Sequence, residues 1–462
     1  MPDDVDALFA RAAAVAADYR RTVGDRPVTA PATLDELRAA FAQPLPDAPL
    51  PADQVLDELV ATATPGLVHT AGGRFYGFVI GGSFPMGVAA DMVVAGWDQC
   101  AYNGVLTPAG QAAEEVAGAW LKDLLGLPAT ASVGFVTGGQ EANTVGLAAA
   151  RHHVLAEAGW DVEADGLAGA PTVRLVAGAE RHATIDRALR LLGFGTNALE
   201  PVVVDANGAI RVDDLAEVLA ARPGGPTIVC LQAGNVNTGA CDPFRDAVAV
   251  ARAHRAWVHV DGAFGLWAAT SERTRHLVDG IELADSWGCD GHKWLNVPYD
   301  SGFAICSRPE VHAAAVRYSA PYLTGSGTTA LAMSDFTLES SRRAKGLTVW
   351  ALLRHLGREG VAEVVDHLCA MARRFAEQLE AGGARIANDV VLNMVLVDFG
   401  DDDRNAAIAA AVQAEGTAWL ATTDWQGRRF LRLSLSSQAT TGADVDAAVT
   451  SILHHAAATG AA

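Results

Sequence analysis

The chain has 462 residues, half of them apolar, which is enough for a large core and at least two lobes. Its formal net charge of −20 repels the phosphate backbone of nucleic acids, and no cluster of basic and aromatic residues offsets it. No stretch approaches the roughly 20 consecutive apolar residues of a membrane span. We therefore expect a soluble protein with neither a nucleic-acid partner nor a membrane partner.

The N-terminus and the cysteines indicate the compartment. The first 20 residues are acidic and then alanine-rich, whereas a secretory signal begins with basic residues and continues into an apolar core. Six cysteines lie far apart without a C-x-x-C pair, which argues against zinc knots and a disulfide framework. We predict a cytoplasmic protein with reduced thiols and no metal site.

Residues 1–72 read as an N-terminal helical arm, with prolines clustered between residues 44 and 51. Seven short β-branched runs follow, each leading through a turn into an alanine-rich helical stretch or a loop. Strands that are apolar throughout and separated by helices belong in a parallel sheet covered on both faces. We therefore predict a large, seven-stranded, mainly parallel α/β domain over residues 73–349. Its expected strands span residues 132–137, 172–177, 199–204, 227–232, 256–260, 284–287 and 302–306.

The pattern changes in the last quarter of the chain. A helical pattern runs from Leu347 to about Gly382, and two strand-like runs follow at residues 390–399 and 429–435. Another helix is expected from Asp444 to the end. A long helix with a small sheet predicts a smaller C-terminal α+β domain over residues 350–462.

The first predicted strand ends in a candidate phosphate cradle. Ligands of open parallel sheets bind at the carboxyl ends of the strands. Here the strand runs into Gly138, Gly139 and Gln140, and a helix follows. Glycines let the backbone approach an anion, and the free N–H groups of a helix N-terminus favour negative charge. Taken alone, a Gly-Gly pair before a helix is often only a turn.

Three further strand ends carry reactive side chains. His182 follows the second strand, Asp261 ends the fifth, and Lys293 follows the sixth. An aspartate at such an end can keep a pyridine nitrogen protonated, and a buried lysine can present a neutral amine as a nucleophile. Singly, each side chain has a structural explanation, such as a helix cap or a snorkelling lysine. His259 shares the face of Asp261, but no third ligand at metal-like spacing accompanies it.

The four features occur together, at successive strand ends. A glycine cradle, an imidazole that can stack, a strand-end carboxylate and a buried amine supply every contact that a phosphorylated pyridine aldehyde requires. We therefore predict that the cofactor is pyridoxal 5′-phosphate (PLP).

At this point the chain resembles the group II PLP-dependent amino-acid decarboxylases, the family of aromatic-L-amino-acid and glutamate decarboxylases. The resemblance extends from about residue 72 to the end, and its most specific element is His292-Lys293-Trp294. It implies the PLP-dependent transferase fold of type I, of the aspartate aminotransferase kind. The motifs that carry it are residues 137–143, His182, residues 261–263, residues 290–295 and residues 340–350.

The resemblance also implies roles for single residues. Lys293 would form the internal aldimine, and His182 would stack on the pyridine ring. Asp261 would pair with the ring nitrogen, and Ala263 would pack against the ring. His292 would hold the phosphate together with the cradle.

Another loop is expected to touch the cofactor. Asn235, Asn237 or Thr238 would contact its phenolic oxygen or its phosphate, with Asn237 the preferred residue. This loop departs from the pattern of the animal enzymes, so the choice among the three stays open.

A tyrosine bears on the type of reaction. Residues 319–323 resemble the family loop whose tyrosine protonates the carbanion, and Tyr322 occupies that place. In related aldehyde synthases a phenylalanine replaces this tyrosine, so Tyr322 favours simple decarboxylation over oxidative deamination. An ordinary turn tyrosine is the alternative.

The predicted substrate pocket is largely apolar and aromatic. Residues 74–83 resemble the pocket-forming stretch of the family, and residues 97–106 are expected to enter from a partner subunit of a homodimer. Phe78, Ile80 and Asn103 are the candidate contacts. Such a pocket suits an aromatic or apolar amino acid better than glutamate, which needs a positive anchor. Arg74 is one candidate anchor.

Arg432 lies in a segment similar to the closing strand of the family, but the residues that follow it depart from the family pattern. Its role as a substrate contact therefore stays open. Aminotransferases of this fold carry a carboxylate-gripping arginine, and Arg432 is the obvious candidate for one.

We predict a PLP-dependent carboxy-lyase that converts a small-molecule L-amino acid to an amine and carbon dioxide. The alternatives with the same cofactor are an aldehyde synthase, a carbon–carbon lyase and an aminotransferase. A non-catalytic binding protein is disfavoured because Lys293 and Asp261 are both present.

Overall fold

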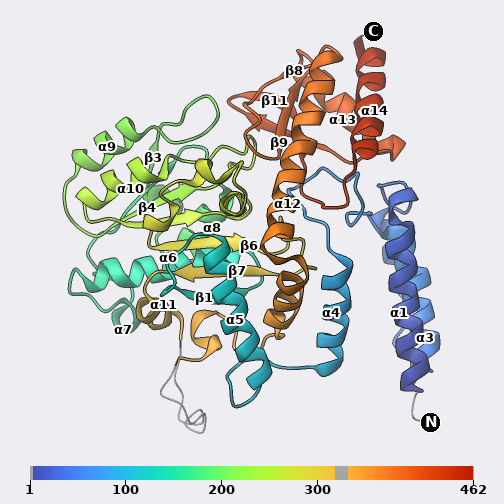
Figure 1. Ribbon diagram of the computed structural model, residues 1–462, viewed down its shortest axis with the longest axis horizontal. Helices are drawn as coiled ribbons and strands as arrows, with labels where there is room; N and C mark the ends of the chain where they lie inside the picture. The colour runs from blue at the N-terminus through green and yellow to red at the C-terminus, as the bar shows by residue number, and fades with distance from the viewer. Residues whose placement is uncertain (1–3, 318–330, 461–462) are drawn as a thin grey trace.

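The computed structural model describes residues 4–317 and 331–460. A large α/β domain and a smaller C-terminal domain are joined by the long helix α12 (Lys345–Ala381), and helices of the N-terminal arm lie at one side (Figure 1). Within the described residues, no helix is both long enough and apolar enough to cross a membrane.

The large domain is built on a seven-stranded sheet with the order β1-β7-β6-β5-β4-β2-β3. The neighbours from β3 to β6 pair in parallel, and β7 is antiparallel to β6 and to β1. The carboxyl ends of β1 to β6 therefore lie at one edge of the sheet. The strands are β1 (Ser132–Val136), β2 (Arg174–Gly178), β3 (Leu199–Val202), β4 (Thr227–Gln232), β5 (Trp257–Asp261), β6 (Ser286–Asp290) and β7 (Gly302–Cys306).

Helices cover both faces of this sheet. On one face, alternate strand residues such as Val229 and Val258 share a core with α5 (Pro108–Leu124), α9 (Val212–Ala221), α10 (Phe244–Ala253) and α12. On the other face, Ile228 and Trp257 pack with α6 (Gly139–Ala156), α8 (Ala183–Leu191) and α11 (Pro309–Val316). Because each central strand is buried on both sides, its sequence is apolar throughout, as predicted.

The predicted fold class is confirmed, with all seven strands present. The largest shift is in β6, which we expected at residues 284–287 and which runs from Ser286 to Asp290. Its Gly-Cys-Asp end reads as a turn in the sequence, but it is fully buried and pairs with β5 and β7. The shift places Asp290 at the strand end.

The C-terminal domain has a four-stranded antiparallel sheet with the order β10-β11-β9-β8. Two strands were expected, and the polar β10 and the two-residue β8 were missed because neither has a run of buried apolar residues. The elements are β8 (Arg385–Ile386), β9 (Met394–Asp398), α13 (Asp402–Glu415), β10 (Ala421–Trp425), β11 (Arg428–Ser434) and α14 (Gly442–Gly460).

Two details concern the predicted domain limits. The limit at residue 350 falls inside α12, which is interrupted by a non-helical residue at Gly357. Near the other limit, Tyr76 belongs to the core of the C-terminal domain, and its carbonyl accepts the N–H of Ser434. Residues 73–79 therefore contact the small domain, although they precede the sheet of the large one.

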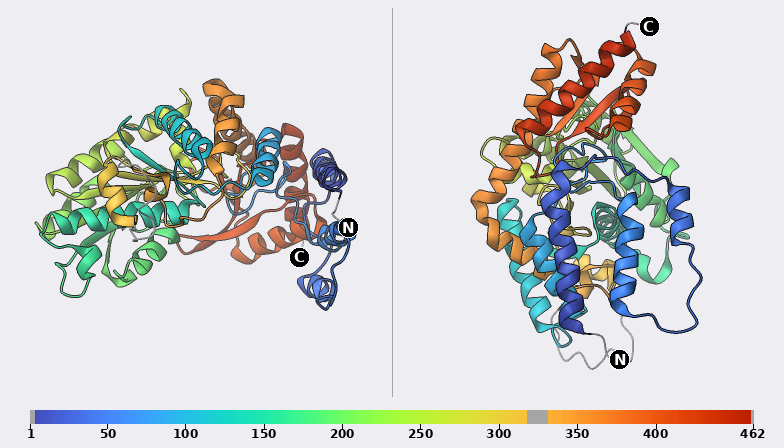
Figure 2. Two further views of the ribbon diagram at one scale, coloured as in Figure 1. Left: turned by 90° about the horizontal axis from the view of Figure 1, so that it is seen from below. Right: turned by 90° about the vertical axis from the view of Figure 1, so that its right-hand side faces the viewer.

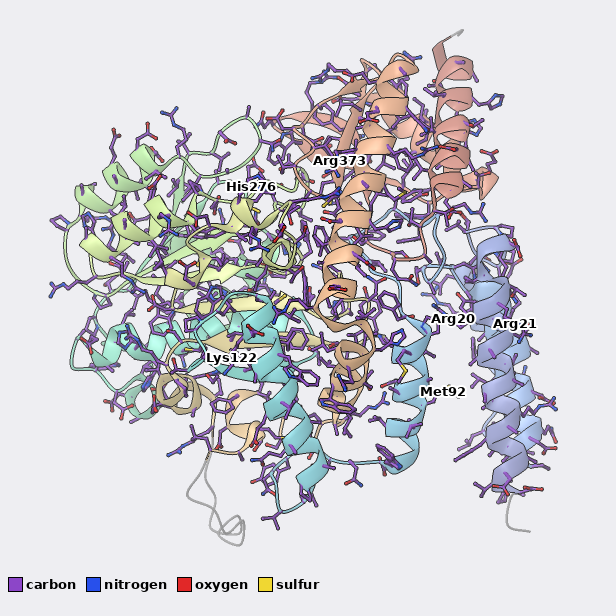
Figure 3. The ribbon with its side chains drawn as sticks, in the orientation of Figure 1. Arg20, Arg21, Met92, Lys122, His276 and Arg373 are labelled. Carbon is purple, nitrogen blue, oxygen red and sulfur yellow. The ribbon has the colours of Figure 1, made fainter. Side chains whose placement is uncertain are left out.

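The N-terminal helices pack loosely on the rest of the chain. α1 (Val5–Thr22), α2 (Leu34–Phe41) and α3 (Ala52–Ala63) contain no buried residue, and Figure 2 shows them on the outside of the body. Arg20, labelled near the end of α1 in Figure 3, donates to the hydroxyl and carbonyl oxygens of Ser83. Two further helices connect the arm to the sheet, α4 (Pro85–Trp97) and α5.

Candidate active site

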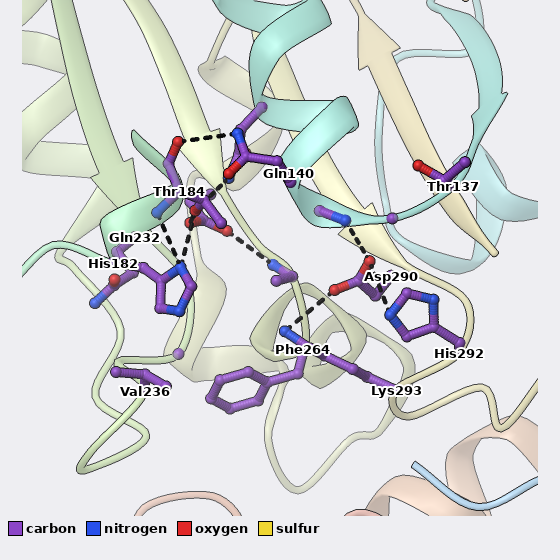
Figure 4. A pocket seen from close by; sticks show the side chains of 16 residues that line it. Thr137, Gln140, His182, Thr184, Gln232, Val236, Phe264, Asp290, His292 and Lys293 are labelled. Atoms are coloured by element: carbon purple, nitrogen blue, oxygen red, sulfur yellow. Dashed lines mark hydrogen bonds and ion pairs between the residues drawn. The ribbon is translucent and has the colours of Figure 1, made fainter. Parts of the chain in front are cut away.

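A cavity of about 330 Å³ lies at the carboxyl ends of the strands (Figure 4). Lys293 and Asp261 both line it, together with Gly138, Gly139 and His182. The side chains that the sequence pattern singled out at four separate strand ends are therefore brought into one cavity. A volume of this size is in the range of small-molecule sites.

The glycine cradle starts the 18-residue helix α6 at the cavity wall. The backbone N–H of Gly139 donates to Oδ1 of Asp290 at 2.5 Å. A Cβ atom at Gly138 would lie 2.8 Å from Cε1 of His292, so only glycine leaves this space open. The amide of Gln140 donates to the carbonyl of Thr184 and holds the cradle against α8. The helix N-terminus therefore faces the cavity with a backbone that an anion can approach.

Asp261 ends β5 as a buried carboxylate, with 5 % of its surface exposed. Its Oδ1 accepts the N–H of Ala263 at 3.2 Å, and its Oδ2 accepts the hydroxyl of Thr184 at 3.2 Å. In the described part of the chain, no cationic side chain forms an ion pair with it. A buried anion with only neutral donors is poorly compensated, so this position suits a positively charged group of a ligand, such as a protonated ring nitrogen.

His182 lines the cavity and also caps α8. Its Nδ1 accepts the N–H of Thr184 at 3.3 Å and lies 2.9 Å from the hydroxyl of the same residue. Burial lowers the pKa of His182, an effect that the charge of Asp261 opposes. The imidazole is therefore neutral near pH 7, and the cap fixes its plane at the cavity wall.

Asp290 joins the lysine to the phosphate cradle. Its Oδ2 lies 3.1 Å from Nζ of Lys293, and its Oδ1 lies 3.5 Å from Nε2 of His292. The Ser301 N–H donates to Nδ1 of His292 at 3.2 Å, so Nε2 carries the proton that faces Asp290. Burial lowers the pKa of His292, against the opposing charge of Asp290. One carboxylate thus contacts the amine, the imidazole and the backbone N–H of Gly139.

Asp290 has no predicted role in the sequence, although it stands at a strand end as Asp261 does. The structure also places Thr184, Val236 and Phe264 at the cavity, and none of these was predicted. Their apolar or small side chains carry no signal in a single sequence. Asp290 was overlooked because β6 was expected to end three residues earlier.

His259 belongs to the support of the site and does not reach the cavity. Its Nε2 donates to Oδ1 of Asn143 at 3.0 Å, and the hydroxyl of Ser286 donates to its Nδ1 at 2.9 Å. Burial lowers the pKa of His259 to about 4, so the ring is neutral. The amide of Asn143 in turn donates to Thr184, which contacts Asp261. The carboxylate is therefore held by a buried hydrogen-bonded chain.

Asn237 is not among the residues that line the cavity. Its Oδ1 accepts the hydroxyl of Thr423 at 2.8 Å, a contact with the C-terminal domain. The amide of Asn235 donates to the carbonyl of Glu180, so this side chain also makes a structural contact within the protein. Val236, between the two asparagines, is the residue that faces the cavity.

The candidate substrate contacts lie outside the cavity within one chain. Phe78 is 60 % exposed and packs on Trp419 at a centroid distance of 5.0 Å. Asn103 is buried and caps a turn, where its Oδ1 accepts the N–H groups of Val105 and Leu106. Ile80 does not line the cavity either. Tyr322 lies outside the described residues.

The two candidate arginine anchors differ in their surroundings. Arg74 donates to three backbone carbonyls, those of Gly24, Arg26 and Thr417, so its guanidinium has a structural role. Arg432 lies beside the cavity, where its Nη1 is 3.5 Å from the carbonyl of Val236. Its buried Nε has no hydrogen-bond partner among the described residues, and burial lowers its pKa.

The residues present fit PLP. The cavity has room for a phosphorylated pyridine, a glycine-lined helix N-terminus for the phosphate, and an uncompensated carboxylate for the ring nitrogen. Lys293 supplies an amine in the same cavity. Each of these features is explained by one ligand.

Gly138→Ala tests the cradle. The added methyl group would meet Cε1 of His292 and displace the imidazole that is expected to hold the phosphate. We therefore expect the affinity for PLP to fall roughly tenfold or more, which is the cost of one lost charge-assisted hydrogen bond. Titration of the apoprotein with PLP, followed by absorbance, measures this affinity. Gly96→Ala, at a helical position with no atom within 4 Å of the new Cβ, is the matched control. Unchanged affinity in the Gly138 variant would contradict the assignment.

Comparison with known proteins supports the same interpretation. Tryptophan decarboxylase 1 of Oryza sativa is 28 % identical over 94 % of this chain and 90 % of its own length. The aromatic-L-amino-acid decarboxylase of Bacillus atrophaeus is 26 % identical, and the phenylacetaldehyde synthase of Arabidopsis thaliana is 25 % identical, each over 92 % of this chain and 90 % of its own. The crystal structure of Oryza sativa TDC with PLP and tryptamine shares the fold, with a TM-score of 0.91, 24 % identity and 99 % of both chains covered.

The model of the pyridoxal-dependent decarboxylase conserved domain matches residues 35–399, which is most of the chain. The predicted cofactor and enzyme class are thereby confirmed: PLP is the cofactor, and the activity is that of a carboxy-lyase. The chain belongs to the family of PLP-dependent amino-acid decarboxylases.

Proposed function

We propose that this enzyme decarboxylates an aromatic L-amino acid to the corresponding amine and that Lys293 is the residue that binds the cofactor covalently. The observation that carries the proposal is the shared cavity, in which Lys293 and Asp261 stand with the glycine cradle. Relatives named as tryptophan and aromatic-L-amino-acid decarboxylases support an aromatic substrate.

Different residues of this chain have different roles in the proposed reaction. When bound, PLP supplies an electron sink for the electron pair that remains when carbon dioxide leaves. Asp261 keeps the ring nitrogen protonated, because a buried carboxylate stabilises a positive partner. Gly138, Gly139 and Gln140 hold the phosphate together with His292, and the neutral ring of His182 lies against the pyridine with Ala263 on the cavity wall.

Asp290 fixes the position of the Lys293 amine. With Nζ of Lys293 at 3.1 Å, the carboxylate stabilises the protonated amine and keeps it inside the cavity. The same carboxylate occupies the N–H of Gly139. We propose that phosphate takes over this N–H when the cofactor binds, so that Asp290 keeps its contacts with Lys293 and His292 alone.

The substrate end of the site is proposed to include Arg432. Its Nη1 lies beside the carbonyl of Val236, its Nε has no hydrogen-bond partner among the residues that the structure describes, and a substrate carboxylate would compensate its charge. Tyr322 is proposed, on sequence resemblance, to return a proton to Cα after carbon dioxide has left.

The lysine assignment can be tested by trapping. The chain has only three lysines, Lys122, Lys293 and Lys345. Lys122, on α5 in Figure 3, donates to the carbonyls of Ala129 and Ala131, and Lys345 pairs with Asp300 at 2.7 Å. After borohydride reduction of the PLP-loaded enzyme, we expect mass spectrometry of the peptides to find the cofactor on Lys293.

The matched variants are Lys293→Ala and Lys122→Ala. The first should lose the absorbance of bound PLP and roughly a thousandfold or more of the turnover, as removal of a covalent catalytic group does. Lys122→Ala should retain both, because this side chain lies on another element. Trapped cofactor on Lys122 or Lys345 would refute the assignment.

An aldehyde synthase is the second candidate, because two matched relatives are phenylacetaldehyde synthase and 4-hydroxyphenylacetaldehyde synthase. Incubation with a panel of amino acids and measurement of amine, carbon dioxide, aldehyde and keto acid distinguish the reactions. We expect amine and carbon dioxide in equal amounts from the wild type. In Tyr322→Phe, loss of the proton donor should reduce amine and increase aldehyde. A keto acid product would indicate transamination instead.

We also propose that the enzyme is a homodimer with shared active sites. The arm helices α1, α2 and α3 bury no residue within one chain, yet amphipathic helices of this length depend on packing for stability. Large apolar side chains are exposed nearby, with Trp97 at 58 %, Val105 at 65 % and Leu106 at 57 %. A second copy that covers this face would bring residues 97–106 to a neighbouring cavity, as the sequence analysis expects.

Light scattering should give a mass of twice the chain's 48.0 kDa. Leu106→Glu should raise the dimer dissociation constant by roughly tenfold or more, because a charge in a buried apolar interface is costly. Leu191→Glu, at an equally exposed leucine of α8 (62 %), is the control. A monomer with full activity would contradict the proposal.

The six cysteines are all unpaired in the structure. This state supports the proposal that the enzyme works in a reducing compartment such as the cytoplasm.

A further inference from the structure

A second cavity, of about 510 Å³, lies at the edge of the large sheet opposite to the cofactor site. Thr227 and Trp257 line it, and these residues begin β4 and β5. The far ends of the same strands, Gln232 and Asp261, line the cofactor cavity. Since five residues of a strand separate the two cavities, they lie roughly 15 Å apart.

The lining of this cavity is basic in a strongly acidic protein. Arg252, Arg255 and Arg308 line it with His153 and His254, and Glu157 is the acidic residue among the lining side chains. The chain as a whole has 54 acidic against 34 basic residues. The local charge therefore has the sign opposite to that of the molecule, and such a concave surface concentrates anions.

Two of the arginines share one buried carboxylate. Asp285, with 2 % of its side chain exposed, lies 2.9 Å from Nη1 of Arg252 and 3.5 Å from Nη2 of Arg308. One negative charge thus compensates two positive ones. The side chains of Arg252 and Arg308 are each 41 % exposed, and both residues line the cavity.

Arg255 adds a third positive charge with no acidic partner. It is exposed, and within the described residues its side chain has no hydrogen bond or ion pair. Its φ of 57° is in the left-handed region, which a branched or bulky residue rarely adopts. The turn between α10 and β5 therefore presents this guanidinium at the cavity without a structural contact to explain it.

His153 shows that positive charge is crowded here. Nη1 of Arg308 lies 2.7 Å from its Nε2, and the guanidinium also stacks over Trp257 at 5.3 Å. Burial and then the charge of Arg308 lower the pKa of His153. The imidazole must therefore stay neutral to accept the guanidinium N–H. An anion in the cavity would relieve this crowding.

A glycine pair leaves part of the wall of this cavity open. Gly224 and Gly225 line the cavity before β4, with φ of 85° and 81°. No atom lies within 4 Å of a Cβ built at either residue. A ligand can therefore approach the backbone of this loop closely.

We propose that this cavity is a second anion site, which binds a small phosphate-bearing molecule with more than one negative charge. Three guanidinium groups against the two carboxylates of Asp285 and Glu157 leave a net positive charge that favours an anion with several oxygens, and the volume exceeds that of the cofactor cavity. The site is separate from the cofactor phosphate, which belongs at Gly138 and Gly139. It does not depend on the substrate of the enzyme.

Isothermal titration with inorganic pyrophosphate tests the site. The enzyme is first saturated with PLP, so that the cofactor cradle is occupied, and sodium chloride keeps the ionic strength constant. We expect one pyrophosphate per chain in the wild type. Arg255→Asn removes the charge but keeps a residue that tolerates a positive φ, and it should weaken binding roughly tenfold. Arg190→Asn, at an exposed arginine of α8, should bind as the wild type does.

The other arms decide the class of ligand. Pyrophosphate should bind more tightly than inorganic phosphate. A nucleoside diphosphate should bind at least as tightly as pyrophosphate, because the cavity of about 510 Å³ has room for the nucleoside. Absence of binding, equal weakening by both arginine variants, or equal affinity for phosphate and pyrophosphate would overturn the proposal.

Discussion

The site depends on the buried carboxylate of Asp261, which accepts hydrogen bonds from neutral donors and, in the part of the chain that the structure describes, forms no ion pair with a cation. Burial of an unpaired charge is unfavourable, so the surrounding structure must hold the residue in place until a positive group arrives. The chain from His259 through Asn143 and Thr184 does this, because each member is fixed by the next. Asp261 ends a central parallel strand with both faces covered, so the residue is only 5 % exposed although it lines the cavity.

Asp290 gives the site its second constraint, at the neighbouring strand end. By contacting Lys293, His292 and the N–H of Gly139, it connects the amine that we propose as the attachment point to the proposed phosphate cradle. The two carboxylates thus have different tasks. Asp261 forms no ion pair among the described residues, whereas Asp290 lies 3.1 Å from the amine of Lys293 and accepts the N–H of Gly139. Because β5 and β6 are adjacent, the two carboxylates line one cavity of small-molecule size.

Sequence patterns predicted the seven strands and the main cavity residues for a physical reason: apolar runs mark strands buried on both faces, and their carboxyl ends meet at one edge. Asp290 was missed because Gly-Cys-Asp resembles a turn, although it is paired on both sides. Asn237 was expected at the cavity, but a loop of three polar residues does not reveal which side chain turns inward. Phe78 and Asn103 do not line the cavity of their own chain, and a single sequence carries no direct signal for contacts between subunits.

The sheet has two chemically different ends, and three elements run between them. α6 begins at Gly139 and passes His153 in its last turn, β5 begins at Trp257 and ends at Asp261, and β6 follows Asp285 and ends at Asp290. The basic cavity and the cofactor cavity therefore lie at opposite ends of the same three elements. The acidic residues at the cofactor edge need positive partners, and the basic residues at the opposite edge need negative ones.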